Sequence, residues 1–412
     1  MANSMVSYLW RDPSAPREFR SGVSLHSHTN QSKETLKFLA KFSSQHPAVR
    51  SLFARMERRS EVNHGMCVNY AAGYWTPPMT PRLALELESR QIEQLDVDAM
   101  VSLSDHDSIS ASTLLRAGPF EREIPISLEW SVPYGGVHDF HLGVHNLPGA
   151  RATQWMQVLA SYTAHPSDER LKEILIALNA EPDVLVVFNH PTWDLFLITR
   201  QKHDFLVNEF LQKFGTWLHA LELNGLRNWD ENRATCRLAE KWNMLLISGG
   251  DRHGVEPNAN INLTNASSFA EFAHEIRCEK RSRILFMPQY AEPWKHRILR
   301  STIDAVRDYP DFPLGSRTWD ERVFHPDGNG VVRSLHDLWP NGSAPPVMRW
   351  GVAIVRLMGR GVVSSGLRMA WSDPRQLRVA LGEPVLDGEL KAAGHAAMSP
   401  ISESIGTSIT QN

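Results

Sequence analysis

The sequence predicts an α/β protein whose parallel sheet closes as a barrel. Between residues 22 and 287, short and nearly continuous apolar runs alternate with longer segments that carry apolar residues every three or four positions. The short runs are typical of strands buried on both faces, and the longer segments are typical of amphipathic helices. Repeated alternation of strand and helix favours parallel strands, and a barrel is the simplest closed arrangement of such strands.

Eight apolar runs are expected to form the strands. They lie at residues 22–28, 99–106, 124–130, 140–147, 184–191, 220–225, 244–251 and 283–287. Helix signals separate them: Thr80 before Pro81 is a typical helix cap, and Ser268 with Glu271 makes a capping box. We interpret residues 35–79 as an insertion over the mouth of the barrel. A lid over a substrate and a packing element are equally compatible with its sequence.

The predicted barrel is flanked by other segments. Residues 1–21 are expected to form an N-terminal segment, and residues 288–394, rich in tryptophan, proline and arginine, a mostly helical C-terminal extension. Residues 395–412 are small and polar, which is typical of a disordered tail.

The extension contains a basic stripe, formed by Arg349, Arg356 and Arg360 on an otherwise apolar helix. A role at a membrane surface stays open. A helix packed on the barrel with its arginine edge in solvent is the favoured interpretation. Because arginines recur through residues 347–371, no uncharged run of membrane-spanning length is present, and no transmembrane segment is expected.

Composition is typical of a globular enzyme. The 412 residues are 42% apolar and 22% charged, with a net charge of −3 and a pI of about 6.7. This balance does not favour broad nucleic-acid binding, although it leaves a small nucleotide substrate open. The three cysteines are far apart and form no CxxC pair, which predicts neither a thiolate zinc site nor a disulfide framework and favours the reducing cytoplasm. Nothing in the sequence indicates an oligomeric state.

Groups that can bind metal ions lie where the apolar runs end. His26 and His28 end the first run, and on a strand these side chains would point the same way, about 6.6 Å apart. The other runs bring Glu34, Asp105, His106, Asp107, Glu129, His138, His141, His190, Glu222, Asp251 and His253. In a barrel these ends share one face, so the groups are expected to converge. Imidazoles and carboxylates without thiolates favour Mn²⁺, Fe²⁺ or Zn²⁺, and so many ligands favour two or three ions.

As a set, these groups resemble the PHP (polymerase and histidinol phosphatase) superfamily. The motifs that match in order and approximate spacing, over roughly residues 22–287, are His26-Ser-His28, Ser104-Asp-His106-Asp, Glu129, His141-Leu-Gly, Asn-His190-Pro and Asp251-Arg-His253. The resemblance implies a distorted (β/α)7 TIM-like barrel with a trinuclear metal centre at its C-terminal face. It also implies metal-dependent phosphoesterase activity.

The resemblance implies that the metal ligands are His26, His28, Glu34, His106, Glu129, His141, His190, Asp251 and His253. Glu34 departs from the pattern, because the family usually has Asp or His there. His141 is preferred to His138 because His-Leu-Gly is the form of the family motif. The residues expected behind the ligands, where they would orient imidazoles or support the barrel, are Asp105, Asp107 and Glu222.

The predicted function is hydrolysis of a small phosphate ester, such as a nucleotide. A metal-bridged hydroxide would attack phosphorus in line while the ions stabilise the developing charge. The residues expected to be catalytic are His26, His28, His106, His190, Asp251 and His253. Arg252, Lys33 and Arg200 are candidate phosphate contacts, although a surface position or a salt bridge suits each of them equally well.

Three other functions stay open. A hydrolase of C–N or C–O bonds could use the same metal centre, since a fold does not fix a function. A non-catalytic scaffold is disfavoured, because none of the ligands is clearly lost. An exonuclease would need basic and aromatic side chains along a groove, and the acidic net charge gives this little support.

Overall fold

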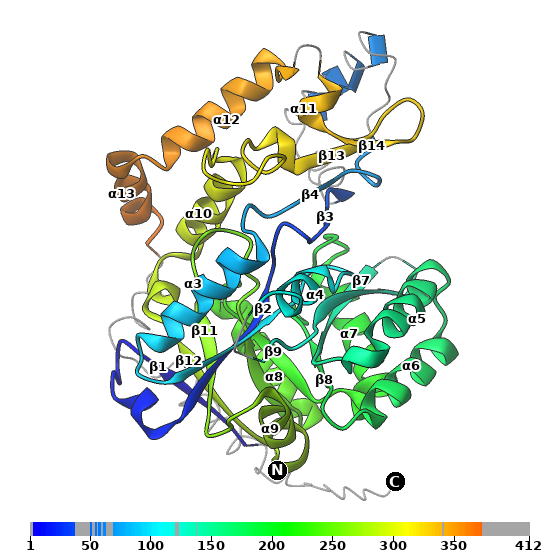
Figure 1. Cartoon of the computed structure of the whole chain (residues 1–412), viewed down its shortest axis with the longest axis vertical. Coiled ribbons are helices and arrows are strands. Elements are labelled where there is room, and N and C mark those ends of the chain that lie inside the picture. The colour runs from blue at the N-terminus through cyan, green and yellow to red at the C-terminus, as the bar shows by residue number, and fades with distance from the viewer. Residues whose placement is uncertain are drawn as a thin grey trace, which may run out of the picture.

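The computed structural model describes residues 3–37, 50–51, 54–55, 57–58, 61–62, 69–119, 123–136, 138–339 and 342–372. These residues form a mixed α/β fold with three sheets. Two five-stranded sheets and their helices make up a large body, and a small four-stranded sheet lies next to α11 in the upper part of the view (Figure 1).

The strands are β1 (Asn3–Tyr8), β2 (Ser21–Ser27), β3 (Glu34–Thr35), β4 (Tyr74–Trp75), β5 (Asp98–Leu103), β6 (Leu128–Tyr134), β7 (His138–His145), β8 (Leu185–Phe188), β9 (Ala220–Asn224), β10 (Leu245–Gly249), β11 (Asn260–Thr264), β12 (Arg281–Phe286), β13 (Val323–Pro326) and β14 (Val332–Ser334). The α-helices are α3 (Pro81–Glu93), α4 (Ser110–Arg116), α5 (Ala152–Ala164), α6 (Asp168–Ala180), α7 (Arg200–Phe214), α8 (Trp229–Trp242), α9 (Phe269–His274), α10 (Trp294–Val306), α11 (Leu335–Leu338), α12 (Pro346–Met358) and α13 (Gly361–Ala370). Each of the eight apolar runs overlaps a strand.

The first sheet has the order β1-β12-β11-β2-β5. β2 pairs with β5 in parallel, whereas β11 runs antiparallel to both of its neighbours. The sequence analysis missed β1 and β11. β1 comes from the expected N-terminal segment, yet it pairs in parallel with β12 as an edge strand. Part of the expected N-terminal segment therefore forms the edge strand of the first sheet.

The second sheet has the order β10-β9-β8-β7-β6. Its strands are parallel from β10 to β8, but β7 is antiparallel to both β6 and β8. Between the two sheets, the described residues form only two isolated bridges, Ser27 with Arg252 and His106 with Glu129. The strand ladders thus do not close, and the expected (β/α)7 barrel is not observed as a continuous sheet.

The two sheets nevertheless share a core. Val23 and Leu25 of β2 lie in one buried cluster with Leu185 of β8 and Ile247 of β10, and Phe269 of α9 packs into the same cluster. Strands from both sheets therefore face each other, and the ends of β2, β5, β8 and β10 come to the same side of this core. The candidate site lies on that side.

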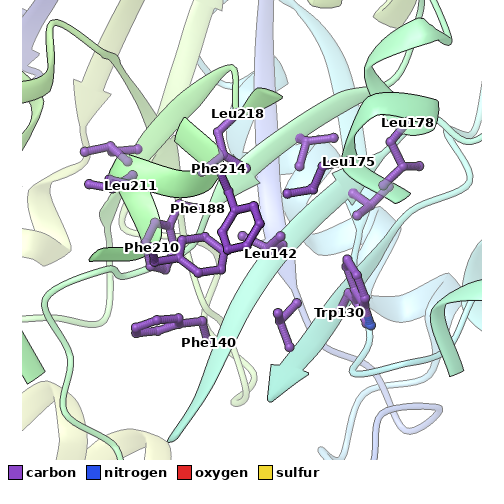
Figure 2. Packing of buried hydrophobic residues seen from close by; sticks show 14 of the residues in the cluster. Trp130, Phe140, Leu142, Leu175, Leu178, Phe188, Phe210, Leu211, Phe214 and Leu218 are labelled. Atoms are coloured by element: carbon purple, nitrogen blue, oxygen red, sulfur yellow. The ribbon is translucent and has the colours of Figure 1, made fainter. Parts of the chain in front are cut away.

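A second core supports the site from behind. The rings of Phe140 on β7, Phe188 on β8 and Phe210 on α7 lie 5.0–5.1 Å apart between centroids, and Figure 2 shows these residues in one group with Leu142 and Phe214. Burial of each such side chain contributes about 1.5–3 kcal/mol. β7 is therefore held firmly where it carries His141.

The small sheet joins two distant parts of the chain. β3 and β4, at the described ends of the predicted insertion, pair in the order β14-β13-β4-β3 with two strands of the C-terminal extension. The extension is thus helical with an added pair of strands. Most of the predicted insertion between residues 38 and 68, the expected tail 395–412 and the rest of residues 373–394 lie outside the described residues.

Helix ends follow the local signals in the sequence. Thr80 accepts a hydrogen bond from the backbone N–H of Leu83, with Pro81 opening α3. Ser268 accepts from the N–H of Glu271, and the Glu271 carboxylate accepts from the backbone N–H and the hydroxyl of Ser267. Among the described residues, no helix has the length and apolar character needed to cross a bilayer.

Candidate metal centre

All nine predicted ligands lie in one cluster at the ends of the strands. Their ligand atoms form four overlapping groups, each within 4.8 Å: His28, Glu34, His106 and His253; His26, Glu129 and His190; His26, His28 and Asp251; and His106, Glu129 and His141. The groups share members, as expected where neighbouring ions share ligands. The side chain of His138, the alternative to His141, lies outside the described residues.

The backbone brings His26 and His28 together by a route that the sequence analysis did not predict. The register between β2 and β5 shifts between Leu25 and Ser27, and His26 has a φ of 61°. Regular strand alternation therefore fails at this point, although the two imidazoles still meet with their centroids 5.1 Å apart. Positive φ recurs at His190 (27°) and Asp251 (55°). Non-glycine residues rarely adopt this conformation, and it is concentrated at functional sites.

Glu129 lies at the middle of the cluster. Its Oε2 is 3.1 Å from His26 Nε2, 3.3 Å from His28 Nε2 and 3.1 Å from His106 Nε2. Its Oε1 is 3.3 Å from His141 Nδ1 and 3.1 Å from His190 Nε2. A carboxylate that faces five imidazoles would be a ligand for metal ions held in this cluster.

The polar atoms at this centre fit cations. His26 Nε2, His28 Nε2 and Glu129 Oε2 are buried, and each lacks a hydrogen bond within the described part of the chain. Buried polar atoms normally have a hydrogen-bond partner or bind an ion, so this group of unsatisfied atoms indicates a ligand site. Nitrogen and oxygen donors without sulfur suit Mn²⁺, Fe²⁺ or Zn²⁺, and the residues therefore fit divalent metal ions.

The electrostatics favour positive charge in the cluster. Burial alone would raise the pKa of Glu129, but the imidazoles of His26, His106 and His141 hold it well below its usual value. Burial opposes protonation of His26, yet the charges of Glu129, Glu222 and Asp251 raise its pKa well above its usual value. The carboxylates therefore stay ionised and attract cations.

Glu222 lies behind two of the ligands. Its Oε1 is 2.6 Å from His26 Nδ1, and its Oε2 accepts a hydrogen bond of 2.7 Å from the backbone N–H of His190. A proton held at Nδ1 leaves Nε2 of His26 as the ligand atom. β10 allows this approach because its Gly249 has no side chain, and a Cβ there would overlap the Glu222 carboxylate.

Asp105 and Asp107 act differently from the expectation that they orient imidazoles. Asp105 accepts hydrogen bonds from the backbone N–H and the hydroxyl of Thr29, just after His28. Asp107 accepts from the backbone N–H of Ser131. Both carboxylates therefore fix the chain beside the ligands and do not hydrogen-bond to an imidazole.

Arg252 was predicted as a phosphate contact, but in the structure its guanidinium is engaged by other residues of the protein. Its side chain is buried, and it donates through Nε to Glu88 Oε1 (2.9 Å), through Nη1 to the Gly254 carbonyl (2.7 Å) and through Nη2 to the His28 carbonyl (3.0 Å). All three guanidinium nitrogens are thus engaged by the protein. Arg252 connects β10 to the chain after β2.

The other two predicted phosphate contacts lie at the surface. Lys33 is exposed, with its Nζ 5.4 Å from the ring centroid of Tyr74. Arg200 is exposed at the start of α7 and lies 3.7 Å from Asp204. Lys33 directly precedes the candidate ligand Glu34, whereas the described contacts of Arg200 do not include the cluster.

The sequence analysis missed Arg227, which lies beside the cluster. Its guanidinium is 3.8 Å from the ring centroid of Trp193, and Nη2 is 3.6 Å from Asp251 Oδ2. The side chain is buried, and its Nε has no hydrogen bond within the described residues. Trp193 in turn lies 5.0 Å from the His190 ring. The signal for Arg227 is its position directly after β9, where strand-end residues face the cluster.

An aromatic side chain from the small sheet also reaches the cluster. The ring of Trp75 on β4 lies 5.8 Å from the ring of His253. His253 and His106 keep some exposure, whereas His26 and His28 are fully enclosed. The cluster is therefore approached from the side of His106, His253 and Trp75.

Comparison with known proteins adds little. No family model and no curated protein matches the chain. Among solved structures, PsfC from Pseudomonas syringae is similar with a TM-score of 0.36 and 15% identity, over 69% of this chain and 97% of PsfC. A Bifidobacterium adolescentis protein, whose assignment as a metal-dependent phosphoesterase is itself provisional, has a TM-score of 0.26 and 15% identity, over 49% of this chain and 91% of its own. Likeness at these TM-scores carries no inference about activity.

Proposed function

We propose that the protein is a metal-dependent phosphoesterase of the PHP type that cleaves a small phosphate ester, such as a nucleotide, with two or three Mn, Fe or Zn ions. The observation that supports this most directly is the position of Glu129 among five imidazoles, where buried nitrogen and oxygen atoms lack partners. The nine proposed ligands are His26, His28, Glu34, His106, Glu129, His141, His190, Asp251 and His253.

Bound divalent ions would lower the pKa of water and neutralise charge on phosphoryl oxygens. The chain's own residues prepare the site for this chemistry. Glu222 fixes the proton of His26 on Nδ1 and holds the backbone of His190. Asp105 and Asp107 fix the loops that follow β2 and β5, so the ligands need little reorganisation.

Arg227 is the proposed contact for the phosphoryl group. Its guanidinium is buried beside Asp251 and has a donor without a partner, which suits an oxyanion more than a neutral group. Stacking on Trp193 fixes the plane of its donors. This preference for an anion supports phosphate esters over the amide or ether substrates of a C–N or C–O hydrolase.

A panel of phosphate esters tests the proposal. Nucleoside monophosphates, bisphosphates, sugar phosphates and a short oligonucleotide are assayed with Mn²⁺ and with chelator. We expect metal-dependent turnover that falls on the order of 100-fold or more in the His26→Ala, His28→Ala double variant. The exposed His165→Ala variant is the matched control and should keep full activity. Bound metal without turnover would favour the C–N or C–O hydrolase, and absence of both would favour a scaffold.

The role of Arg227 has its own test. Arg227→Ala should lower kcat/KM about 10- to 100-fold, because a charged hydrogen bond to the phosphoryl group contributes about 1.5–3 kcal/mol. Arg227→Lys should restore part of the activity, since it keeps the charge without the planar fork. Arg200→Ala changes an exposed arginine and should leave kcat/KM unchanged. An unchanged kcat/KM in Arg227→Ala would contradict the assignment.

A further inference from the structure

The C-terminal helices α12 and α13 present an apolar face to solvent. Trp350, Ile354 and Leu357 follow each other at spacings of four and three residues, which places them on one side of α12, and all three are exposed, Trp350 to 72%. α13 also exposes large apolar side chains, among them Val362, 89% exposed, and Met369. Single exposed apolar residues are ordinary, but a contiguous row marks an interaction surface.

This face is not the one with which α12 packs on the protein. The opposite side of α12 contacts α10, where Gly359 approaches Ile303 so closely that a Cβ would overlap it. Arg356 also binds inward, through hydrogen bonds to the Val306 carbonyl and an ion pair of 2.7 Å with Asp308. The packing on α10 therefore fixes which side of α12 faces outward.

Basic residues border the apolar face without acidic partners on the same helices. Residues 346–372 contain four arginines and no aspartate or glutamate. With Arg356 bound to Asp308, Arg349 stays exposed on α12, about 100° from Trp350 around the helix axis, and Arg360 is exposed in the turn between α12 and α13. Arg368 is exposed on α13.

We propose that α12 and α13 form a docking surface for an anionic phospholipid bilayer. The apolar row would enter the boundary between headgroups and acyl chains, and Arg349, Arg360 and Arg368 would pair with lipid phosphates. Neither helix is long enough to cross the membrane, so the surface lies on the bilayer. A second copy of the chain fits less well, because a two-fold contact would bring two sets of unpaired arginines together.

Vesicle co-sedimentation of the full chain tests this surface. Phosphatidylcholine vesicles are compared with vesicles that contain about a third of phosphatidylglycerol. We expect binding to the anionic vesicles that weakens with added salt, falls about fivefold for each of Arg349→Ser and Arg360→Ser, and is lost in the Trp350→Ser, Ile354→Ser double variant. Leu314→Ser and Arg200→Ser change exposed residues of the same types elsewhere and should bind as the wild type does.

An Ile354→Cys variant shows whether the face is open before lipid is added. We expect thiol labelling at position 354 to be fast in the free protein and slowed by anionic vesicles. Slow labelling without vesicles would overturn the proposal, because it would mean that residues 373–412 or a second copy already cover the face. Absence of binding to anionic vesicles would overturn it as well. So would a dimer in size-exclusion chromatography that Trp350→Ser dissociates. Unchanged metal content and thermal unfolding would show that each variant is folded.

Discussion

Replacing Glu129 by glutamine probes the candidate metal centre directly, because it removes one charge and almost no volume. In the structure, the carboxylate lies 3.1–3.3 Å from five imidazole nitrogens. A neutral amide has a single acceptor oxygen and would turn its NH₂ group toward some of these imidazoles. Glutamine therefore cannot act as a carboxylate bridge between cations.

The expected loss follows from linkage. Removing a residue that only supports a metal ligand raises the dissociation constant about 10- to 100-fold, and loss of Glu129 itself should cost at least as much. Bound metal stabilises the folded state by RT ln(1 + [M]/Kd), so a 100-fold weaker site lowers the metal-dependent stabilisation by about 2.7 kcal/mol.

Urea unfolding with Mn²⁺ and with chelator measures this difference, and elemental analysis after dialysis gives the metal content. The wild type should lose stability when chelator is added, whereas Glu129→Gln should unfold almost identically in both conditions. Retained metal content and retained sensitivity to chelator in Glu129→Gln would refute the reasoning.

Glu88→Gln provides a contrasting buried glutamate. Glu88 is also fully enclosed, but protein donors satisfy it: Ser24, Ser27, the backbone of Asn258 and Arg252 at 2.9 Å. Weakening this buried ion pair should cost about 3 kcal/mol. We expect the loss to be similar with metal and with chelator, which distinguishes support of the fold from binding of ions.

Further predictions concern packing, pH and a helix cap. Gly249→Ala should displace the Glu222 carboxylate and lower metal affinity about 10-fold or more by elemental titration, whereas Gly351→Ala, which meets no atom, should not. Burial lowers the pKa of His219 to about 3. Because the unfolded histidine binds a proton below about pH 6.5 and the folded one does not, stability should fall by about 1.4 kcal/mol per pH unit on acidification, and urea titrations of His219→Leu should show a shallower slope. Thr80→Ala should cost about 1 kcal/mol in the same assay, and no loss would contradict its role as the cap of α3.

The location of the candidate site was predictable because its signals are local. Each ligand lies at or near the end of an apolar run, and run ends can be read from the sequence without knowing which strands pair. His190 and Asp251 lie 61 residues apart in the chain, yet both follow strands of the same sheet. Convergence therefore required only that the strand ends share one side.

Strand pairing was less predictable. β11 alternates Asn260, Ile261, Asn262 and Leu263, and a run with so many amides does not resemble a buried strand. Its asparagines are buried because their side chains hydrogen-bond to β9 and β10, through the Leu223 carbonyl and through Ser248. The partners of such groups lie far along the chain, and the local pattern does not contain them. The local sequence of β7 likewise does not indicate that β7 runs antiparallel to β6 and β8.

Arg252 and Arg227 show that neighbours in the sequence do not determine which arginine lies beside the ligands. Arg252 stands between Asp251 and His253 in the sequence, and this neighbourhood suggested a phosphate contact. In the structure Asp251 has a φ of 55°, and the side chain of Arg252 after it turns away from the ligand cluster. Arg252 accordingly reaches Glu88, which is 164 residues away in the chain. Arg227 has no ligand next to it in the sequence, but the loop after β9 places it beside Asp251.

The positive φ values at His26, His190 and Asp251 mean that the backbone of the candidate site lowers the free energy of unfolding. Each conformation costs an ordinary L-residue about 1–2 kcal/mol that glycine would not incur. Glycine at any of the three positions would remove this strain, but it would also remove a buried side chain and its ion pairs, and that loss costs more. The strained conformations are therefore sustained by the packing and charge of the cluster itself.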